Sequence, residues 1–583
     1  MIFNHLRRVD WALLAVAVVF VFFQVYLELE IPGYMSKITT IMTTGGTSQQ
    51  VLEEGYWMLA CAFGSLVMAI VVGYIAAYIG TNLGKTLRER QFANVQRFSA
   101  AELNRFSIYS LITRSTNDVN QVQLAFTIGF MVCIRAPIMA VWAILKISTK
   151  NVEWTMATAV SIIGMVCCIS VIIWYVYPRF KKIQWMNDDV NRITKEGLSG
   201  IRVIHAYNAE RFQEQRFEEA NAKLTGTHLE VTRALAFLFP IITLVMSALS
   251  MAIYWIGAII INGTPAIQDR ITEFSDMVVF SSYAMQVIGA FLLLILVFMV
   301  LPRAMVAARR IDEVITTEPT IKDGTVEGSP QGAEGEISFR NVSFRYPDAA
   351  RDSLTDISFD ISKGQTLAII GSTGSGKSTL VKMIPRFYDV TGGQILVDGV
   401  DVREYTLDSL HSKIGYVPQK ASLFSGTIES NVNYGDTETG RTEDDVREAV
   451  RIAQATEFVE AMEDDYQGKV AEGGTNLSGG QKQRISIARA VCRRPEFYIF
   501  DDSFSALDYK TDRVLRSELK KETAGVTTII VAQRIGTIMD ADKIVVLDEG
   551  RMVGIGTHEE LLRDCDVYHQ IAVSQLSEEE LMR

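Results

Sequence analysis

The chain has 583 residues, which exceeds the length of an ordinary single domain. Apolar side chains make up 49% of it, the mean hydropathy is +0.18, and the net charge is −11 at pH 7. Such an acidic chain has no general electrostatic attraction for nucleic acid, so nucleic acid is excluded as a principal partner. The six cysteines form no C-x-x-C pair and four lie in apolar runs, so we expect neither a metal site nor a disulfide framework.

Residues 1–10 carry two arginines, and the apolar run after them has no small-residue cleavage site, which predicts a cytoplasmic flank and no signal peptide. Six segments are apolar over the roughly 20 residues that a helix needs to cross a bilayer core. They are 11–31, 56–79, 127–145, 154–177, 238–261 and 277–301. Lysine and arginine concentrate in the second and fourth connections, so the positive-inside rule places these and both termini in the cytoplasm. The sequence therefore predicts a multi-pass protein of the cell membrane.

The two basic connections have helical spacing at 83–98 and 188–198. We expect short turning helices at 101–111 and 205–213, and these tips would contact a cytoplasmic domain. Arg135 lies inside the third span, where a charge is costly and needs a cavity or a partner. A structural pairing and a substrate role both remain open, and Glu28 and Glu30 are expected to lie too near the outer surface to pair with it. The Phe, Tyr and Met side chains of the spans suit helix packing or an apolar substrate cavity.

The pattern changes after the sixth span. Residues 316–336 are rich in Thr, Pro, Gly and acidic side chains without apolar periodicity, which predicts a linker. From residue 337 short β-rich runs alternate with helical segments, as in an α/β domain. We therefore expect a membrane domain at 1–315, a linker at 316–336 and an α/β domain at 337–583.

A glycine-rich loop follows the apolar strand 366–370 and precedes the apolar helix 380–384. Its sequence fits G-x-x-x-x-G-K-[ST], whose backbone N–H groups bind phosphates at a helix N-terminus. Lys377 would meet the β- and γ-phosphates of a nucleoside triphosphate, and Ser378 would ligate Mg²⁺. The nucleotide-binding residues of the loop are Gly371, Ser372, Thr373, Gly374, Ser375, Gly376, Lys377, Ser378 and Thr379.

Further motifs surround this loop in the chain. Tyr346 lies 25 residues before Gly371 and would stack on an adenine ring, and Gln419 ends a strand-like run where it would reach Mg²⁺ and the attacking water. Asp501 ends the buried run 497–501 and would hold the metal shell, and Gln533 ends the next strand.

A Leu-Ser-Gly-Gly-Gln pentapeptide opens a helix with Ser478 as N-cap, which predicts a second helix N-terminus that binds anions. This signature comprises Ser478, Gly479, Gly480 and Gln481, and Asp508 follows in Ser-Ala-Leu-Asp.

The signature between the phosphate loop and the acidic strand resembles that of ATP-binding cassette proteins. One six-span domain fused ahead of one cassette is similar to an exporter half-transporter, over essentially the whole chain. The resemblance includes residues 110–118, 134–137 and 200–210 and is closest to one subunit of heterodimeric bacterial multidrug exporters. It implies a membrane all-α six-helix domain fused to an α/β P-loop cassette. It also implies two cassettes that pair head to tail around two ATP molecules with Mg²⁺, each between one chain's phosphate loop and the other's signature.

Two positions depart from the family pattern. Asp502 stands where the catalytic residue is usually Glu, and Gln533 stands where it is usually His. Asp is one methylene shorter, and a misplacement of about 1 Å costs on the order of 100-fold in rate. Gln533 accepts no proton, whereas histidine does. We therefore expect a degenerate site built from Asp502, Gln533 and Gln419, an intact signature that serves a partner carrying Glu and His, and thus a heterodimer; a homodimer with two slow sites is the alternative.

The expected activity is ATP-driven export of amphipathic small molecules through the lipid membrane. Two alternatives remain open from the residues alone: a flippase for lipid or lipid-like substrates, and an ATP-gated channel or regulatory subunit.

Overall fold

The computed structural model describes residues 6–148, 152–329, 334–435 and 441–576. The chain forms two compact units: Met1–Asn94 with Tyr109–Thr317, and Val95–Ile108 with Glu318–Arg583. Residues 1–5 of the expected N-terminal flank and 330–333 of the expected linker lie outside the described ranges.

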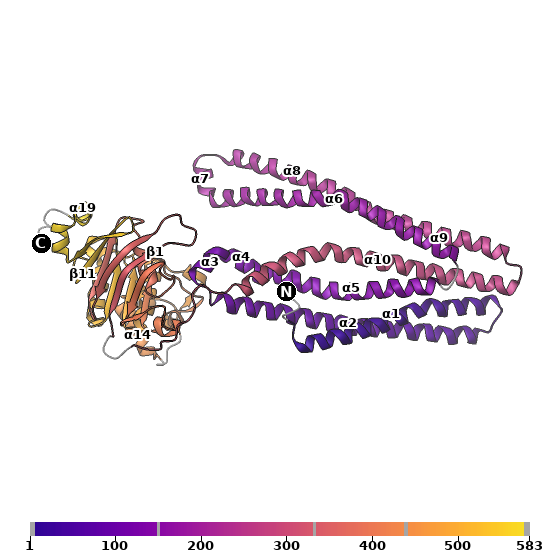
Figure 1. The fold of residues 1–583 in the computed structure, drawn as a ribbon, viewed down its shortest axis with the longest axis horizontal. Helices are drawn as coiled ribbons and strands as arrows, with labels where there is room; N and C mark the ends of the chain where they lie inside the picture. The colour runs from indigo at the N-terminus through magenta and orange to yellow at the C-terminus, as the bar shows by residue number, and fades with distance from the viewer. Residues whose placement is uncertain (1–5, 149–151, 330–333, 436–440, 577–583) are drawn as a thin grey trace. The chain divides into compact units, whose positions relative to one another are not determined.

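The first unit consists of long helices, drawn in indigo to rose in Figure 1. Six of its described helical stretches are long and apolar enough to cross a membrane, which confirms the six predicted spans. Three short helices of this unit's described residues lie between the long ones: α4 (Ile108–Thr113), the π-helix η2 (Arg114–Asp118) and α7 (Ile201–Ala206). The long helices are α1 (Arg8–Thr43), α2 (Ser48–Val95), α5 (Val119–Ser148), α6 (Val152–Ser199), α8 (Glu210–Ala236), α9 (Leu238–Gly263) and α10 (Ile267–Thr316).

The core of this unit is an apolar cluster between helices. On α1 the buried side chains Val21, Val25 and Leu29 recur at every fourth position, so they form one stripe along the helix. They pack with apolar side chains of α5 and α10, which are the most extensively packed pair of helices in this unit. The α6 and α8 helices pack along one another, as Figure 1 also shows.

Charged side chains within the membrane helices pair with each other. The Arg135 Nη2 of α5 donates to both carboxylate oxygens of Glu28 on α1, at 2.9 Å each, and Lys146 Nζ lies 2.9 Å from Glu30 Oε1. The expectation that Glu28 is too near the outer surface to meet Arg135 was wrong, because a long arginine side chain can span a difference in depth. Each pair is neutral in sum, which lowers the free-energy cost of placing charges among apolar helices.

The turning helices differ from the predicted ranges. The first predicted helix is split in two, α3 (Ala100–Phe106) and α4, because Ser107 has φ +56° and interrupts the helical backbone. The second short helix is α7 at Ile201–Ala206, and the predicted range 205–213 instead spans a turn and the start of α8. Asn208 in that turn has φ +50°, a left-handed conformation that asparagine tolerates.

The first tip belongs to the second unit. Ser99 caps α3, and Glu102 Oε1 accepts a hydrogen bond from Thr320 N at 3.3 Å. Asn104 Nδ2 donates to Tyr388 OH at 3.2 Å. These bonds attach α3 to the C-terminal domain, so this tip makes the contact expected of it.

The second unit is an α/β domain with two main sheets, a six-stranded one of order β12-β11-β3-β10-β9-β6 and a four-stranded one of order β2-β1-β4-β5. The strands from β11 to β6 are parallel, and β12 is an antiparallel edge strand. The carboxyl ends of β3, β6, β9 and β10 therefore lie along the same edge of the sheet. The six-stranded sheet comprises β3 (Thr366–Gly371), β6 (Ile414–Val417), β9 (Phe497–Asp501), β10 (Thr527–Val531), β11 (Lys543–Asp548) and β12 (Arg551–Gly556). The four-stranded sheet comprises β1 (Ile337–Phe344), β2 (Leu354–Ile361), β4 (Gly392–Val397) and β5 (Val400–Asp401).

Helices and a small strand pair, β7 (Gly426–Thr427) with β8 (Lys469–Val470), complete this unit. Apolar side chains of both main sheets meet in one core cluster, and the helices α13, α14 and α16 share a second with β9. The helices are α11 (Lys377–Met383), α12 (Leu407–Ser412), α13 (Ile428–Val432), α14 (Glu443–Ile452), α15 (Thr456–Glu460), α16 (Gly479–Cys492), α17 (Tyr509–Glu522), α18 (His558–Asp564) and α19 (Asp566–Gln575). Three 3₁₀ turns also occur, at Asp465–Gln467, Glu472–Gly474 and Ile535–Thr537.

The segment between α10 and β1 is docked on this domain along part of its length. Val326 forms a parallel bridge with Tyr405, and Gly328 N donates to Ser409 Oγ at 2.9 Å. The composition of the segment is typical of a linker, but its backbone hydrogen bonds attach it to residues 404–406, just before α12.

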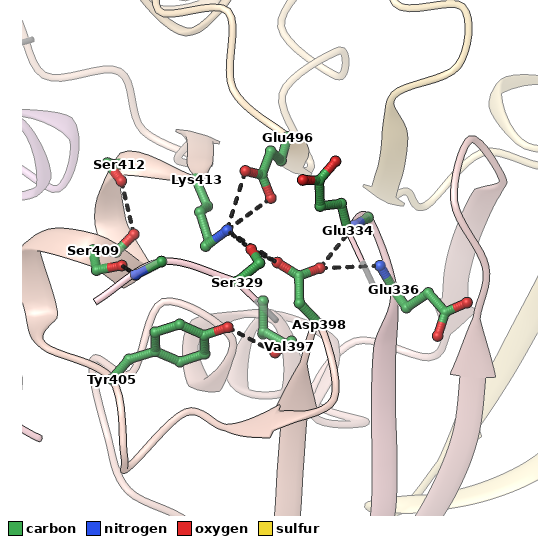
Figure 2. A network of polar contacts seen from close by, with 12 residues as sticks. Ser329, Glu334, Glu336, Val397, Asp398, Tyr405, Ser409, Ser412, Lys413 and Glu496 are labelled. Atoms are coloured by element: carbon green, nitrogen blue, oxygen red, sulfur yellow. Dashed lines mark hydrogen bonds and ion pairs between the residues drawn. The ribbon is translucent and has the colours of Figure 1, made fainter. Parts of the chain in front are cut away.

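A buried polar network holds the end of this segment (Figure 2). Asp398 is fully buried and accepts hydrogen bonds from Ser329 Oγ and Gly335 N, each at 2.7 Å. Lys413 Nζ lies 3.0 Å from Asp398 Oδ2 and 2.9 Å from Glu496 Oε2. Burial acts to lower the pKa of Lys413, but the two carboxylates outweigh it and the pKa is raised. The network therefore stabilises a charged lysine inside the domain.

Candidate functional site

The glycine-rich loop joins β3 to α11 at the open end of the six-stranded sheet. Gly374 and Gly376 have φ +87° and +98°, a region that residues with a Cβ rarely adopt. A Cβ on Gly376 would also lie only 2.7 Å from Leu354 Cδ2. The backbone therefore requires glycine here, and it leads directly into the N-terminus of α11, where unsatisfied N–H groups favour anions.

Lys377 is buried at the first position of α11 and folds back over its own loop. Its Nζ donates to Gly371 O at 2.9 Å and to Ser372 O at 2.8 Å. Burial lowers the pKa of Lys377, and the charges of Asp502 and Asp501 partly oppose this. Among the described residues the Ser375 hydroxyl is buried without a hydrogen-bond partner. A buried ammonium and an unpaired hydroxyl in one loop suit an anionic ligand such as a phosphate group.

Asp501, at the end of β9, faces α11. Its Oδ1 accepts a hydrogen bond from Ser378 Oγ at 2.7 Å, and its Oδ2 accepts one from Tyr416 OH at 3.3 Å. Burial raises the pKa of Tyr416, so its hydroxyl remains a donor. A carboxylate and a hydroxyl this close are hard oxygen ligands of the kind that Mg²⁺ prefers.

Asp502 follows directly and lies between two glutamines. Its Oδ2 accepts a hydrogen bond from Gln533 Nε2 at 2.7 Å and another from Gln419 Nε2 at 3.1 Å. The backbone of Asp502 has φ +51°, and its N–H is bonded to Val531 O at 3.0 Å. Strand β10 thus fixes a strained turn that directs this carboxylate at both amides.

Most of the predicted residues line one cavity of about 830 Å³, but Gly371, Ser372, Ser375 and Asp501 are not in its described wall. Tyr346 lies at its wall, with its hydroxyl 3.1 Å from Thr379 Oγ1. The predicted residues in the wall are Tyr346, Thr373, Gly374, Gly376, Lys377, Ser378, Thr379, Gln419, Asp502 and Gln533.

The signature lies apart from this cavity. Ser478 caps α16 and accepts a hydrogen bond from Gln481 N at 3.3 Å, which confirms the predicted N-cap. Asp508 caps α17 by accepting a hydrogen bond from Thr511 N at 2.9 Å. Gly480 lies beside residues 506 and 507, so the signature and the Ser-Ala-Leu-Asp turn are neighbours. None of Ser478, Gly479, Gly480, Gln481 and Asp508 is in the described wall of the cavity.

Sequence reasoning missed two segments of the wall, 349–353 and 549–550. Gly550 has φ +77°, and a Cβ on it would lie 2.6 Å from Ser353 O, so the two segments are in close contact. The Glu-Gly pair is an ordinary turn signal, and nothing in it indicates proximity to the phosphate loop.

Comparisons with known proteins agree with this architecture. Residues 14–291 match the family model described as ABC transporter transmembrane region, and residues 354–505 match that described as ABC transporter. An uncharacterised ABC transporter ATP-binding protein of Mycobacterium tuberculosis is 38% identical over 94% of this chain and 93% of the relative. An ATP-dependent lipid A-core flippase of Pseudomonas fluorescens is 33% identical over 85% of this chain and 81% of the relative. The solved structure of a bacterial Atm1-family ABC exporter with ATP bound superposes with a TM-score of 0.78 at 25% identity, covering 97% of this chain and 98% of that one.

A membrane unit of six spans fused to a C-terminal ATPase domain defines a half-transporter of the exporter class, whose activity is ATP-driven transport. The chain belongs to the ABC transporter family.

Proposed function

We propose that this chain is the slow-hydrolysing subunit of a heterodimeric exporter in the cell membrane, with both termini in the cytoplasm. ATP would occupy the cavity at the phosphate loop. Lys377 and the loop N–H groups would hold its phosphates, and Tyr346 would stack on its adenine. Ser378 and Gln419, with Asp501 beside them, would hold the Mg²⁺ that neutralises phosphate charge.

The observation that carries this proposal is the pair of amides on Asp502 Oδ2, next to an intact phosphate loop. A general base must have an oxygen within reach of the attacking water. The Asp502 side chain is short, and one of its oxygens already accepts two hydrogen bonds. Lys377 and Ser378 bind phosphate and metal independently of that oxygen, so nucleotide binding would persist while hydrolysis is slow.

The position of the signature supports pairing with a second chain. Ser478 and Gly480 lie outside the described wall of this chain's own cavity, so they are available to a nucleotide bound elsewhere. In the head-to-tail pairing that the family resemblance implies, that nucleotide belongs to the partner. A partner with Glu and His at the positions of Asp502 and Gln533 would hydrolyse ATP there at an ordinary rate.

The proposed cargo is an amphipathic small molecule of the multidrug type. A second candidate is a lipid or lipid-like substrate, because the relatives include ATP-dependent lipid A-core flippases that are 31–33% identical to this chain. Stimulation of ATPase activity by drug-like cations or by lipid A, measured on the same reconstituted pair, distinguishes the two.

The test is to purify the chain alone and together with a half-transporter that carries Glu and His, both in lipid nanodiscs. We expect the pair to hydrolyse ATP and the lone chain to retain unhydrolysed ATP through gel filtration. Rapid turnover by the lone chain would contradict the proposal.

A further inference from the structure

The last helix of the domain contacts the loop that carries Gln533. At the end of α19, Gln575 Nε2 donates to Gln533 O at 2.9 Å, and Gln575 Oε1 accepts from Ile535 N at 2.9 Å. One side-chain amide thus bonds the loop on both sides of Arg534, as a neighbouring strand would.

The helix that carries Gln575 is firmly packed. Tyr568 and Ala572 of α19 are fully buried in one cluster with Ala532 and Ile535 of the loop. The Tyr568 hydroxyl lies 2.7 Å from His558 Nδ1 on α18. The buried face of the helix therefore anchors the backbone that carries Gln575, whose side chain is exposed and lies over the loop.

A second contact holds the far end of the same loop. Arg516 on α17 donates from Nη1 to Gly536 O at 3.1 Å. Its guanidinium is itself bonded to the buried Asp512 at 2.9 and 3.1 Å. Arg516 and Gln575 thus bond the backbone of the loop at three positions, residues 533, 535 and 536.

We propose that Gln575 is a positioning residue that acts through Gln533. By fixing the Gln533 backbone, it keeps Gln533 Nε2 on Asp502 Oδ2 and so holds the wall of the nucleotide cavity closed. The inference deepens the proposed function, on which it rests, by assigning control of nucleotide retention to the C-terminal helix. Nothing in the signature, the phosphate loop or the acidic strand indicates this residue.

The test uses the full chain with its partner and measures dissociation of a non-hydrolysable ATP analogue with Mg²⁺. Gln575→Met keeps the length of the side chain but removes the donor and the acceptor. Two neutral hydrogen bonds together correspond to about a tenfold change in an equilibrium, so we expect about tenfold faster release. Gln570→Met makes the same chemical change on an exposed position of α19 and should leave release unchanged.

A double-mutant cycle separates positioning from general destabilisation. If Gln575 acts through Gln533, then Gln575→Met should accelerate release less than twofold in a Gln533→Ala background. An equal acceleration in both backgrounds, or none in the wild-type background, overturns the proposal. If Gln575→Met lowers the yield of folded protein, Gln575→Ala replaces it in the same cycle. Because release of a non-hydrolysable analogue does not depend on hydrolysis, this result stands apart from the test of the slow site.

Discussion

Replacing Asp502 by Glu and Gln533 by His should turn the proposed slow site into a hydrolytic one. In the structure Asp502 Oδ2 receives hydrogen bonds at 2.7 and 3.1 Å from the two glutamines. Hydrogen bonds to a charged group contribute roughly 1.5–3 kcal/mol each. Releasing one therefore makes this oxygen about ten- to a hundredfold more available to accept a hydrogen bond from the attacking water. The added methylene also moves the carboxylate by about 1 Å, which is again on the order of 100-fold in rate. Both effects act on the same carboxylate and are not additive, so we expect the double substitution Asp502→Glu/Gln533→His to raise turnover at this site by at least about 100-fold.

The assay must report this site alone. The chain is therefore paired with a half-transporter whose own phosphate-loop lysine has been replaced, so that the remaining phosphate release comes from the cavity at Lys377. Asp540→Glu, the same change at an exposed aspartate, should leave turnover unchanged. An increase of less than twofold in the double variant would refute the reasoning, because the two substitutions would then not be what limits hydrolysis.

Three further outcomes follow from buried or paired charges. Lys413→Met should destabilise the cassette by roughly 3–5 kcal/mol in urea unfolding, because it leaves the fully buried Asp398 without its cation. Arg135→Gln and Glu28→Gln should each lower the thermal unfolding midpoint in detergent, because each leaves one charge unpaired among the membrane helices. Burial lowers the pKa of His558 below its unfolded value, so protonation favours the unfolded state. Stability of the cassette should therefore fall as the pH drops below about 6.5, and His558→Gln should lessen that fall.

Matched variants make these outcomes decisive. Lys420→Met removes an exposed lysine and should cost less than about 0.5 kcal/mol. The double variant Glu28→Gln/Arg135→Gln removes both charges, so its thermal unfolding midpoint should lie closer to that of the wild type than the sum of the two single losses predicts. If the double variant lost as much midpoint as the two single variants together, the two residues would not act as a pair. If the stability of His558→Gln depended on pH as that of the wild type does, His558 would not cause the loss of stability at low pH.

The sequence predicts the parts of this protein that depend on local pattern. A bilayer imposes a minimum apolar length, so the six spans follow from hydropathy. The phosphate loop needs glycine at positions such as Gly376, where φ is +98° and the Leu354 side chain and the Ser353 carbonyl are near. The N-cap at Ser478 follows from the reciprocal bonding of Ser and Gln three residues apart.

The remainder depends on contacts between distant segments. The pairing of Arg135 with Glu28 joins residues 107 apart and needs the relative depth of two helices, which hydropathy does not give. Gln575 lies 42 residues from Gln533, and a side-chain amide bonded to backbone has no sequence signature. The turning helices were misplaced because single residues with positive φ, Ser107 and Asn208, end or redirect them. Ser107 gives no local sign of the break, whereas asparagine at position 208 is a residue type that is common in turns.

The two glutamines that bond Asp502 and the one that bonds the backbone of Gln533 share one chemical property. Gln419, Gln533 and Gln575 each carry an amide, which donates and accepts hydrogen bonds but does not titrate. A histidine at position 533 would change its charge near neutral pH and would alter its bond to Asp502 with each protonation. The contacts from Gln575 to Gln533 and from Gln533 to Asp502 are therefore made by amides that do not titrate. A site that retains nucleotide would benefit from this constancy. The side chain at position 533 then offers the same hydrogen-bonding groups at every physiological pH, so nucleotide affinity does not depend on its protonation.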